Sequence, residues 1–339
     1  MKIINAGYQI INEPSITRKI ERVARVCYKS EDKIDEGTDM IMCRSLINRQ
    51  HTAMLEHGNL VLEVGEQEYA LIETIRSFME NMIEDNEENK KCFLRYTNRT
   101  DAECVEYHYV VSGNIRAWYE FMQYANSVNG LPKRLYNLVN DNVNNIFDID
   151  VTEFDSVVFD TYDSDDFYAK VITDMSTLSD EERMVHETFS VLFTVDRGVT
   201  HELVRMRDCS FAQESTRYCN YNLGKFGNEI TVIKPCFWDE DSVMYKEWKM
   251  AMTDSEIHYF ELIKLGAKPQ EARDALPTSV KADIVMTTNL AEWKHIFNLR
   301  ACDSTGPAHP QMAEIMRPLL REMKQKYPFA FGDLVIPGE

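Results

Sequence analysis

The first part of the chain alternates between helical and strand-like spacing of its apolar side chains. Residues 15–29 carry apolar side chains three or four positions apart, and Ser15 stands where an N-cap would. Residues 36–50 repeat this amphipathic pattern, whereas Asn59–Val64 alternate between two faces. We therefore predict two helices followed by a strand.

The middle of the chain mixes regular segments with a long polar stretch. Residues 66–82 and Ile115–Val128 have helical periodicity, and Tyr107–Val111 has the pattern of a strand. Between residues 141 and 183, Asp, Asn and Glu are frequent and periodicity is weak. That stretch predicts a solvated excursion rather than a second domain.

Regular patterns return near residue 187. Glu187–Val195 is rich in β-branched and aromatic residues, which favours a strand. We expect a turn at Asp196-Arg197-Gly198, a short helix over Thr200–Met206 and a long helix over 240–265. Further elements are expected as a helix after Pro269, a strand near 282–288 and helices near 290–299 and 310–325. Strands and helices are interspersed without regular βαβ units, so the pattern favours an α+β fold with a mixed or antiparallel sheet flanked by helices.

Size and composition are those of a globular protein. A chain of 339 residues, 44% hydrophobic and 27% charged, is long enough for a large core. It has no apolar run of about 18 residues that would predict a membrane span, and its first residues lack the pattern of a secretory signal, so we expect a cytoplasmic protein. The formal net charge of −19 disfavours binding to a nucleic-acid backbone. A small phosphate can still bind where arginines gather in one pocket.

The cysteines and histidines show no metal-binding spacing. No Cys-x-x-Cys pair occurs, and neither His186-Glu187 nor His201-Glu202 is followed by the second histidine of a zinc-protease helix. We predict no metal, and thiols that are reduced and mostly buried.

One segment concentrates groups that bind anions. Arg205 and Arg207 are two positions apart, so on an irregular turn they could hold two different anions. In an extended strand, Gln213, Ser215 and Arg217 would point to one side and combine hydrogen-bonding groups with a guanidinium. The chain has no Gly-x-Gly-x-x-Gly motif and no P-loop, so a nucleotide would have to be held by such side chains. The alternative is a surface ladder of solvated charges.

This segment resembles the signature of flavin-dependent thymidylate synthases. That signature is Arg-His-Arg, seven residues, then Ser, and here it reads Arg205-Met206-Arg207, seven residues, then Ser215-Thr216-Arg217-Tyr218. Further blocks follow the family's order and cover, with the signature, roughly 1–64 and 187–325. They are His51-Thr52-Ala53-Met54-Leu55-Glu56-His57, Arg273 before Leu276-Pro277, Asn289, Asn298-Leu299-Arg300 and Ala308-His309-Pro310-Gln311.

The resemblance implies a fold and a reaction. The fold would be like that of thymidylate synthase complementing proteins, a single domain over residues 1–339 with 66–186 as an insertion that compact family members lack. The reaction would be reductive methylation of dUMP to dTMP, with FAD as cofactor and NADPH and methylenetetrahydrofolate as co-substrates. The resemblance also implies a homotetramer with shared active sites, and neither nucleic acid nor membrane as a partner.

The resemblance also assigns roles to individual residues. Arg300 would be catalytic and stabilise an ionised uracil ring. Ser215 would be a ligand and not a nucleophile, since no histidine lies within the motif to activate it. dUMP would be bound by Glu202, Arg205, Gln213, Ser215, Thr216, Arg217, Arg273 and Arg300. FAD would lie against His51, Ala53, Glu56, Met206, Arg207, Asp208, Asn289 and His295.

The chain also departs from the family pattern. Met206 replaces the motif histidine and lacks its hydrogen-bond donor and titratable ring. Ala53 and Met54 replace Ser or Thr and Pro, and residues 304–307 lengthen the loop after Arg300. Two alternatives to an active synthase therefore stay open: a relative with altered pyrimidine specificity, and a flavin- or nucleotide-binding protein without turnover.

Overall fold

The chain divides into two compact units. The computed structural model describes residues 1–65, 69–84, 94–100, 107–128, 133–151, 168–215, 221 and 228–339. The first unit comprises Met1–Asn12, Val23–Asp32 and Phe189–Glu339, and the second comprises Glu13–Arg22 and Lys33–Thr188. Helix α1 (Ile16–Tyr28) therefore contributes residues to both units.

The first unit is built on a four-stranded sheet with strand order β2-β7-β10-β8. Strand β2 pairs antiparallel with β7, and β8 pairs antiparallel with β10. Strands β1 and β9 form a separate parallel pair. The strands are β1 (Lys2–Ile4), β2 (Gly7–Ile11), β7 (Thr188–Asp196), β8 (Ser210–Gln213), β9 (Thr231–Ile233) and β10 (Lys281–Asn289). The helices are α7 (Arg197–Leu203), α8 (Val243–Lys264), α9 (Pro269–Ala272), η6 (Arg273–Ala275), α10 (Leu290–Arg300), α11 (Pro310–Lys326) and α12 (Pro328–Phe331).

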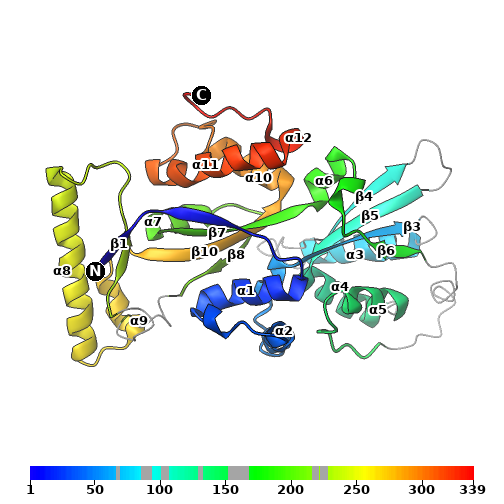
Figure 1. Ribbon diagram of the computed structural model, residues 1–339. Helices are drawn as coiled ribbons and strands as arrows, with labels where there is room; N and C mark the ends of the chain where they lie inside the picture. Colours follow the sequence, from blue (N-terminus) through cyan, green and yellow to red (C-terminus); the bar gives the residue numbers. More distant parts are fainter. Residues whose placement is uncertain are drawn as a thin grey trace. The chain divides into compact units, whose positions relative to one another are not determined.

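Aromatic packing fixes helix α10 on this sheet. Helix α10 follows β10 directly and lies beside α11, which packs against β2 (Figure 1). The ring of Trp293 stacks on that of Phe189 in β7, with centroids 4.5 Å apart. The Trp293 indole N–H also donates to the Phe189 carbonyl oxygen at 3.2 Å, so the polar atom of a fully buried ring is satisfied. The last residue of α10 is Arg300, and its backbone position therefore depends on this packing.

Helix α8 is a surface helix of the same unit. It buries one stripe of large side chains, Tyr245, Trp248, Met252 and Tyr259, in a hydrophobic cluster with residues of β9. The remaining faces of the helix are largely exposed. This is the pattern of an amphipathic helix that packs through a single stripe.

The second unit is built on an antiparallel sheet with strand order β4-β5-β3-β6, against which α4 and α6 pack (Figure 1). Leu62 of the central strand lies opposite Val111 of β5 and Val171 of β6. The strands are β3 (Asn59–Gly65), β4 (Arg95–Thr100), β5 (Tyr107–Asn114) and β6 (Ala169–Val171). The helices are η1 (Glu31–Lys33, which begins in the first unit), α2 (Thr38–Asn48), η2 (Thr52–His57), α3 (Tyr69–Glu84), α4 (Ile115–Val128), α5 (Lys133–Asp141), η4 (Met175–Thr177) and α6 (Asp180–His186).

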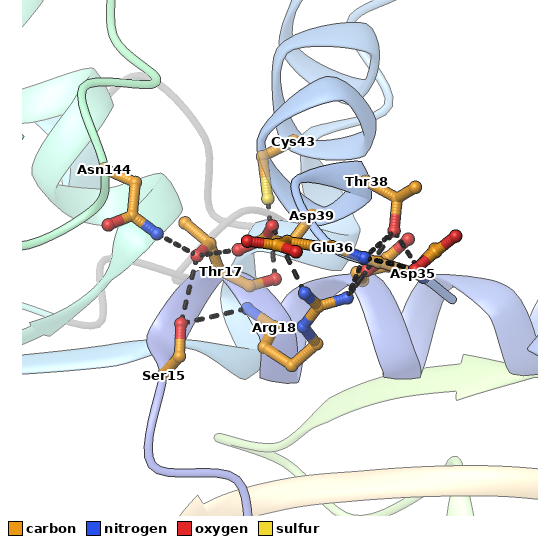
Figure 2. A network of polar contacts seen from close by, with 10 residues as sticks. Ser15, Thr17, Arg18, Asp35, Glu36, Thr38, Asp39, Cys43 and Asn144 are labelled. Atoms are coloured by element: carbon orange, nitrogen blue, oxygen red, sulfur yellow. Dashed lines mark hydrogen bonds and ion pairs between the residues drawn. The ribbon is translucent and has the colours of Figure 1, made fainter. Parts of the chain in front are cut away.

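A polar network holds the first turns of α1 against α2 within the second unit (Figure 2). Thr17 donates to the Asp39 carboxylate at 2.6 Å. The Arg18 guanidinium lies 2.9 Å from a Glu21 oxygen and 3.7 Å from an Asp39 oxygen. Both carboxylates are buried, so the Arg18 charge compensates for their loss of hydration.

The α+β class with a mixed or antiparallel sheet is confirmed. Helix α4 spans the predicted residues Ile115–Val128, and strand β3 exceeds its prediction by one residue. The turn predicted at Asp196-Arg197-Gly198 is wrong, because Arg197 begins α7. There, the Asp196 carboxylate accepts the Val199 N–H at 2.8 Å and caps the helix.

The stretch predicted as a solvated excursion over residues 141–183 contains regular elements that the sequence did not predict. Residues 152–167 lie outside the described residues. From residue 169 onward the chain forms β6, η4 and the start of α6. A strand of three residues offers too few positions to show alternation, and its pairing with β3 determines it.

Candidate functional site

The arginine segment (residues 205–218) begins in an irregular turn that follows helix α7. Helix α7 ends at Leu203, but the N–H groups of Arg205 and Met206 still donate to the carbonyls of Glu202 and Leu203, at 3.3 and 3.0 Å. Arg205 and Arg207 are exposed, whereas Met206 between them is buried and only 8% exposed. The backbone thus presents two guanidinium groups to solvent while the thioether anchors the turn in the core.

Asp208 closes this turn in the left-handed region, with φ of 54°. Aspartate is among the few residues besides glycine that adopt this conformation readily. The Asp208 carbonyl accepts a hydrogen bond from the Thr288 hydroxyl at 2.7 Å. Because Thr288 belongs to β10, the turn is tied to the sheet directly after Arg207.

Glu202 and Arg300 form an ion pair at the end of two helices. The distance between Arg300 Nη1 and Glu202 Oε2 is 3.3 Å. The Arg300 Nε atom is buried, and none of the described residues accepts a hydrogen bond from it. A buried N–H without an acceptor costs free energy unless a ligand or water supplies the acceptor. The structure therefore brings together two predicted dUMP residues and leaves one buried donor without an acceptor among the described residues.

Gln213 and Ser215 lie at the end of the edge strand β8. Gln213 lies opposite Ile284 of β10, and its amide nitrogen donates to the Thr200 hydroxyl at 3.0 Å. Ser215 is half-buried just beyond the strand. Thr216 and Arg217, also predicted to bind dUMP, lie outside the described residues.

Arg197 is a candidate ligand that the sequence analysis missed. Its Nη2 donates to the Glu214 carbonyl at 3.1 Å, next to Ser215, and its backbone N–H donates to the Thr278 carbonyl at 2.8 Å. Its Nε is buried and has no acceptor among the described residues. The sequence did not indicate this role, because a single arginine in a predicted turn belongs to no motif. Arg273, a predicted dUMP residue, is exposed at the start of η6.

The predicted flavin residues of the first unit differ in exposure. Asn289 is buried, and its side-chain oxygen accepts the Glu292 N–H at 2.9 Å as the N-cap of α10. His295, six residues further along the chain, is exposed. Asn289 therefore has a structural role, whatever else it contacts.

The second unit contains the other three predicted flavin residues. His51 and Ala53 are exposed at the start of η2. Glu56 is buried, and its carboxylate lies 2.8 Å from Arg116 Nη1. The charge of Glu56 is therefore already paired, a partner that the sequence did not indicate.

Cys43, which is buried, and Cys27, which is half-buried, are unsuited to nucleophilic chemistry. Burial raises the pKa of Cys43 to about 12 and that of Cys27 to about 11. Both are thiols at neutral pH, and the thiolate is the reactive form. Within the described part of the chain, no group of three or more His, Cys, Asp or Glu side chains is placed to hold a metal ion.

Two surface cavities are formed by described residues. One of about 490 Å³ in the first unit is lined by Asp303, Pro307, Ala308, Pro310, Ala313, Glu314, Arg317, Pro318 and Arg321. Another of about 440 Å³ in the second unit is lined by Glu63, His108 and residues 170–174 and 177. Neither cavity is lined by a predicted site residue. Among the described helices, none is long and apolar enough to cross a membrane.

The fold and these side chains define an α+β protein with an arginine-rich segment suited to an anionic ligand. Comparison with known families agrees: residues 153–329, more than half of the chain, match the family described as thymidylate synthase complementing protein. The chain belongs to this family.

Individual relatives carry a more specific name. The chain is 35% identical to the flavin-dependent thymidylate synthase of Pyrococcus abyssi over 149 residues, which are 43% of this chain and 58% of the relative. It is 31% identical to the enzyme of the same name from Corynebacterium glutamicum over 157 residues, 42% of this chain and 59% of the relative. The chain thus spans somewhat more than half the length of these relatives.

Proposed function

We propose that this protein is a flavin-dependent thymidylate synthase that converts dUMP to dTMP by reductive methylation. Methylenetetrahydrofolate would supply the carbon and NADPH the reducing equivalents. The observation that carries the proposal is Arg300, ion-paired with Glu202 at 3.3 Å and with a buried Nε that has no acceptor among the described residues. The match to the family and the names of the relatives support it.

Different residues of the first unit would bind different parts of dUMP. The Arg300 guanidinium would stabilise negative charge on the uracil ring, and Glu202 would hold it in orientation. The phosphate would form ion pairs with Arg205, Arg197 and Arg273. It would also accept hydrogen bonds from Gln213 and Ser215. Thr216 and Arg217 complete the set that the family resemblance assigns.

The donor set near the turn fits a flavin dinucleotide. The two phosphates of FAD need cationic partners, and the exposed Arg207 makes no ion pair with another described residue. Bound there, FAD would supply the hydride transfer that no side chain can perform. His51, Ala53, Glu56, Met206, Asp208, Asn289 and His295 are the further residues that we assign to it.

The first test is made on the purified protein. We expect a yellow protein with a flavin absorption band that shifts when dUMP is added. With methylenetetrahydrofolate and NADPH present, dUMP labelled with deuterium at C5 should release its label. A colourless protein that releases no label would exclude the proposal.

The role of Arg300 is tested by substitution. Arg300→Gln should lower kcat by a factor on the order of 10²–10³, the usual loss for one donor to a developing negative charge. The flavin band should be unchanged. Arg321→Gln, which removes a guanidinium paired with Glu339 at the surface, is the control and should keep full activity.

A second candidate function follows from the burial of Met206. The family has a histidine at this position, and here the side chain is packed in the core. A protein that binds dUMP and FAD without turnover, or acts on another pyrimidine, would fit this substitution. Product masses from dUMP and dCMP separate these cases, and a gain of activity in Met206→His would favour the binding protein.

A further inference from the structure

Glu214, the residue before Ser215, is buried among opposite charges. Its carboxylate oxygen lies 2.7 Å from Lys281 Nζ and 3.6 Å from Lys29 Nζ. The same oxygen accepts the backbone N–H of Asp283 at 3.3 Å. Only 2% of the Glu214 side chain is exposed. A carboxylate buried to this degree needs such partners to remain charged.

Asp283 completes the group. Its carboxylate contacts Lys29 Nζ, lies 2.6 Å from Lys281 Nζ and accepts the Thr194 hydroxyl at 2.7 Å. Burial alone would raise the pKa of Asp283, but the charges of the two lysines outweigh it and lower that pKa. We call Lys29, Lys281, Glu214 and Asp283 the charge cluster. With two positive and two negative members, it leaves no net buried charge.

The charge cluster fixes the backbone as well as the side chains. The Glu214 N–H donates to the Asp283 carbonyl at 2.8 Å, which extends the β8–β10 ladder by one residue. On its other side, the Glu214 carbonyl accepts from Arg197 at 3.1 Å. Since side chains alternate along an extended chain, an inward Glu214 directs Gln213 and Ser215 to the opposite side. These are two of the residues that we assign to dUMP.

The members come from three separate segments. Lys281 and Asp283 begin β10, and Glu214 follows β8. Lys29 follows the last residue of α1, outside the part of the chain that matches the family. Buried ion groups often contribute less stability than apolar packing would, but they fix geometry strictly because each charge requires its partner. Such a group beside Ser215 suits a positioning role better than a purely stabilising one.

We propose that the charge cluster is a positioning device that holds Gln213 and Ser215 in the orientation needed to bind the nucleotide. This inference rests on the proposed function, because the readout is dUMP binding. The cluster touches neither substrate nor cofactor and acts through these two residues.

The test is a double-mutant cycle in the flavin-containing protein, with dUMP affinity measured by calorimetry. Lys281→Met should raise the Kd for dUMP about tenfold, while kcat at saturating dUMP stays within about a factor of two. Ser215→Ala should raise the Kd in the natural protein but add little in the Lys281→Met protein, because its hydroxyl is already misplaced there. Additive effects, or an unchanged Kd in Lys281→Met, would overturn the inference.

A matched control and a milder variant keep the test decisive. Lys264→Met removes a lysine whose ion pair with Glu261 is largely exposed, and it should leave the Kd unchanged. If Lys281→Met does not fold, Lys29→Gln replaces the more accessible lysine, whose side chain is 21% exposed. It should raise the Kd about threefold with the same loss of the Ser215 effect. An unchanged Kd in Lys29→Gln would then overturn the inference.

Failure of the inference and failure of the proposed function give different results. If calorimetry detects no binding of dUMP to the natural protein, the proposed function fails. If it binds dUMP and the lysine variants bind equally well, only the positioning role fails.

Discussion

At the scale of single residues, His186 shows how burial sets a protonation state. Its ring nitrogens lie 2.7 Å from the Ser112 hydroxyl and 2.9 Å from the Thr97 hydroxyl, inside the second unit. A hydroxyl can donate or accept, so a neutral imidazole makes both bonds here. Burial, with a contribution from Arg95, lowers the pKa of His186 to about 4.

This shift predicts how stability depends on pH. Between pH about 6.5 and about 4, the unfolded chain binds a proton at His186 and the folded chain does not. The free energy of unfolding should therefore fall as pH drops through this window, by at most about 1.4 kcal/mol per pH unit from this residue. Above pH about 6.5, His186 should contribute no pH dependence. Urea titrations from pH 4 to 8 measure the slope.

The matched variants are His186→Gln and His258→Gln. His258 is exposed on α8, so its substitution should leave the slope as it is. His186→Gln should flatten the slope in the acidic window. A slope that is the same in both variants would contradict the assigned protonation state.

The candidate site could be predicted only where the sequence carries a motif. Arg205, Arg207, Gln213 and Arg300 could be assigned because they stand in the order of the family's signature blocks. Arg197 and the Arg116 partner of Glu56 were missed, because a contact between distant segments leaves no local pattern. The burial of Met206 could not be predicted either, because an irregular turn has no periodicity that would show which side chains point into the core.

At the scale of elements, the cap of helix α7 determines where the arginine segment starts. The Asp196 carboxylate accepts the Val199 N–H at 2.8 Å, and its other oxygen accepts the Gln311 amide at 2.5 Å. Asp196→Ala should lower the free energy of unfolding by about 2–3 kcal/mol, through loss of the cap and of the part-buried hydrogen bond from Gln311. Denaturation in urea measures it.

The control for this prediction is another N-cap of the same unit. Ser242 caps α8 by accepting the Tyr245 N–H at 3.1 Å. Ser242→Ala should cost about 1 kcal/mol, the usual value for a cap alone. Equal losses in the two variants would mean that the Asp196–Gln311 bond contributes nothing.

The network that joins α1 to α2 gives a second prediction at this scale. Arg18→Met would remove the cation that lies beside the buried carboxylates of Glu21 and Asp39. It should destabilise the protein by about 2–3 kcal/mol, less than for a fully buried pair because the Arg18 side chain is 26% exposed.

Arg22→Met provides the comparison on the same helix. Arg22 lies 2.9 Å from one Glu13 oxygen, and both side chains are partly exposed. This change should cost less than about 1 kcal/mol. A loss in Arg18→Met no larger than in Arg22→Met would show that the network of Figure 2 adds no stability.

Long elements were predicted well and short ones poorly, for a physical reason. Helices of eleven or more residues, such as α4 and α10, repeat their pattern often enough to be recognised. Strands β1, β6 and β9 have three residues each, and pairing with a distant strand determines them. The start of α7 was missed because Asp-Arg-Gly is equally compatible with a turn and with a capped first helical turn.

At the scale of the whole molecule, the resemblance to the family predicts the assembly. We expect a homotetramer, with a mass in light scattering four times the 39.5 kDa of one chain. Dilution that dissociates the tetramer should also abolish the conversion of dUMP, if the active sites are shared. A monomer with full activity would rule out shared sites.

The contrast between buried and exposed methionines has a consequence for chemical damage. Peroxide converts accessible methionines to polar sulfoxides. Met244 and Met250 on α8 are 58% and 56% exposed, against 8% for Met206. Oxidant should therefore modify Met244 and Met250 before Met206, whose thioether is protected while the turn stays closed. After mild peroxide treatment, mass spectrometry of the peptides would measure the oxidation of Met206. The rate of that oxidation would report how often the turn opens.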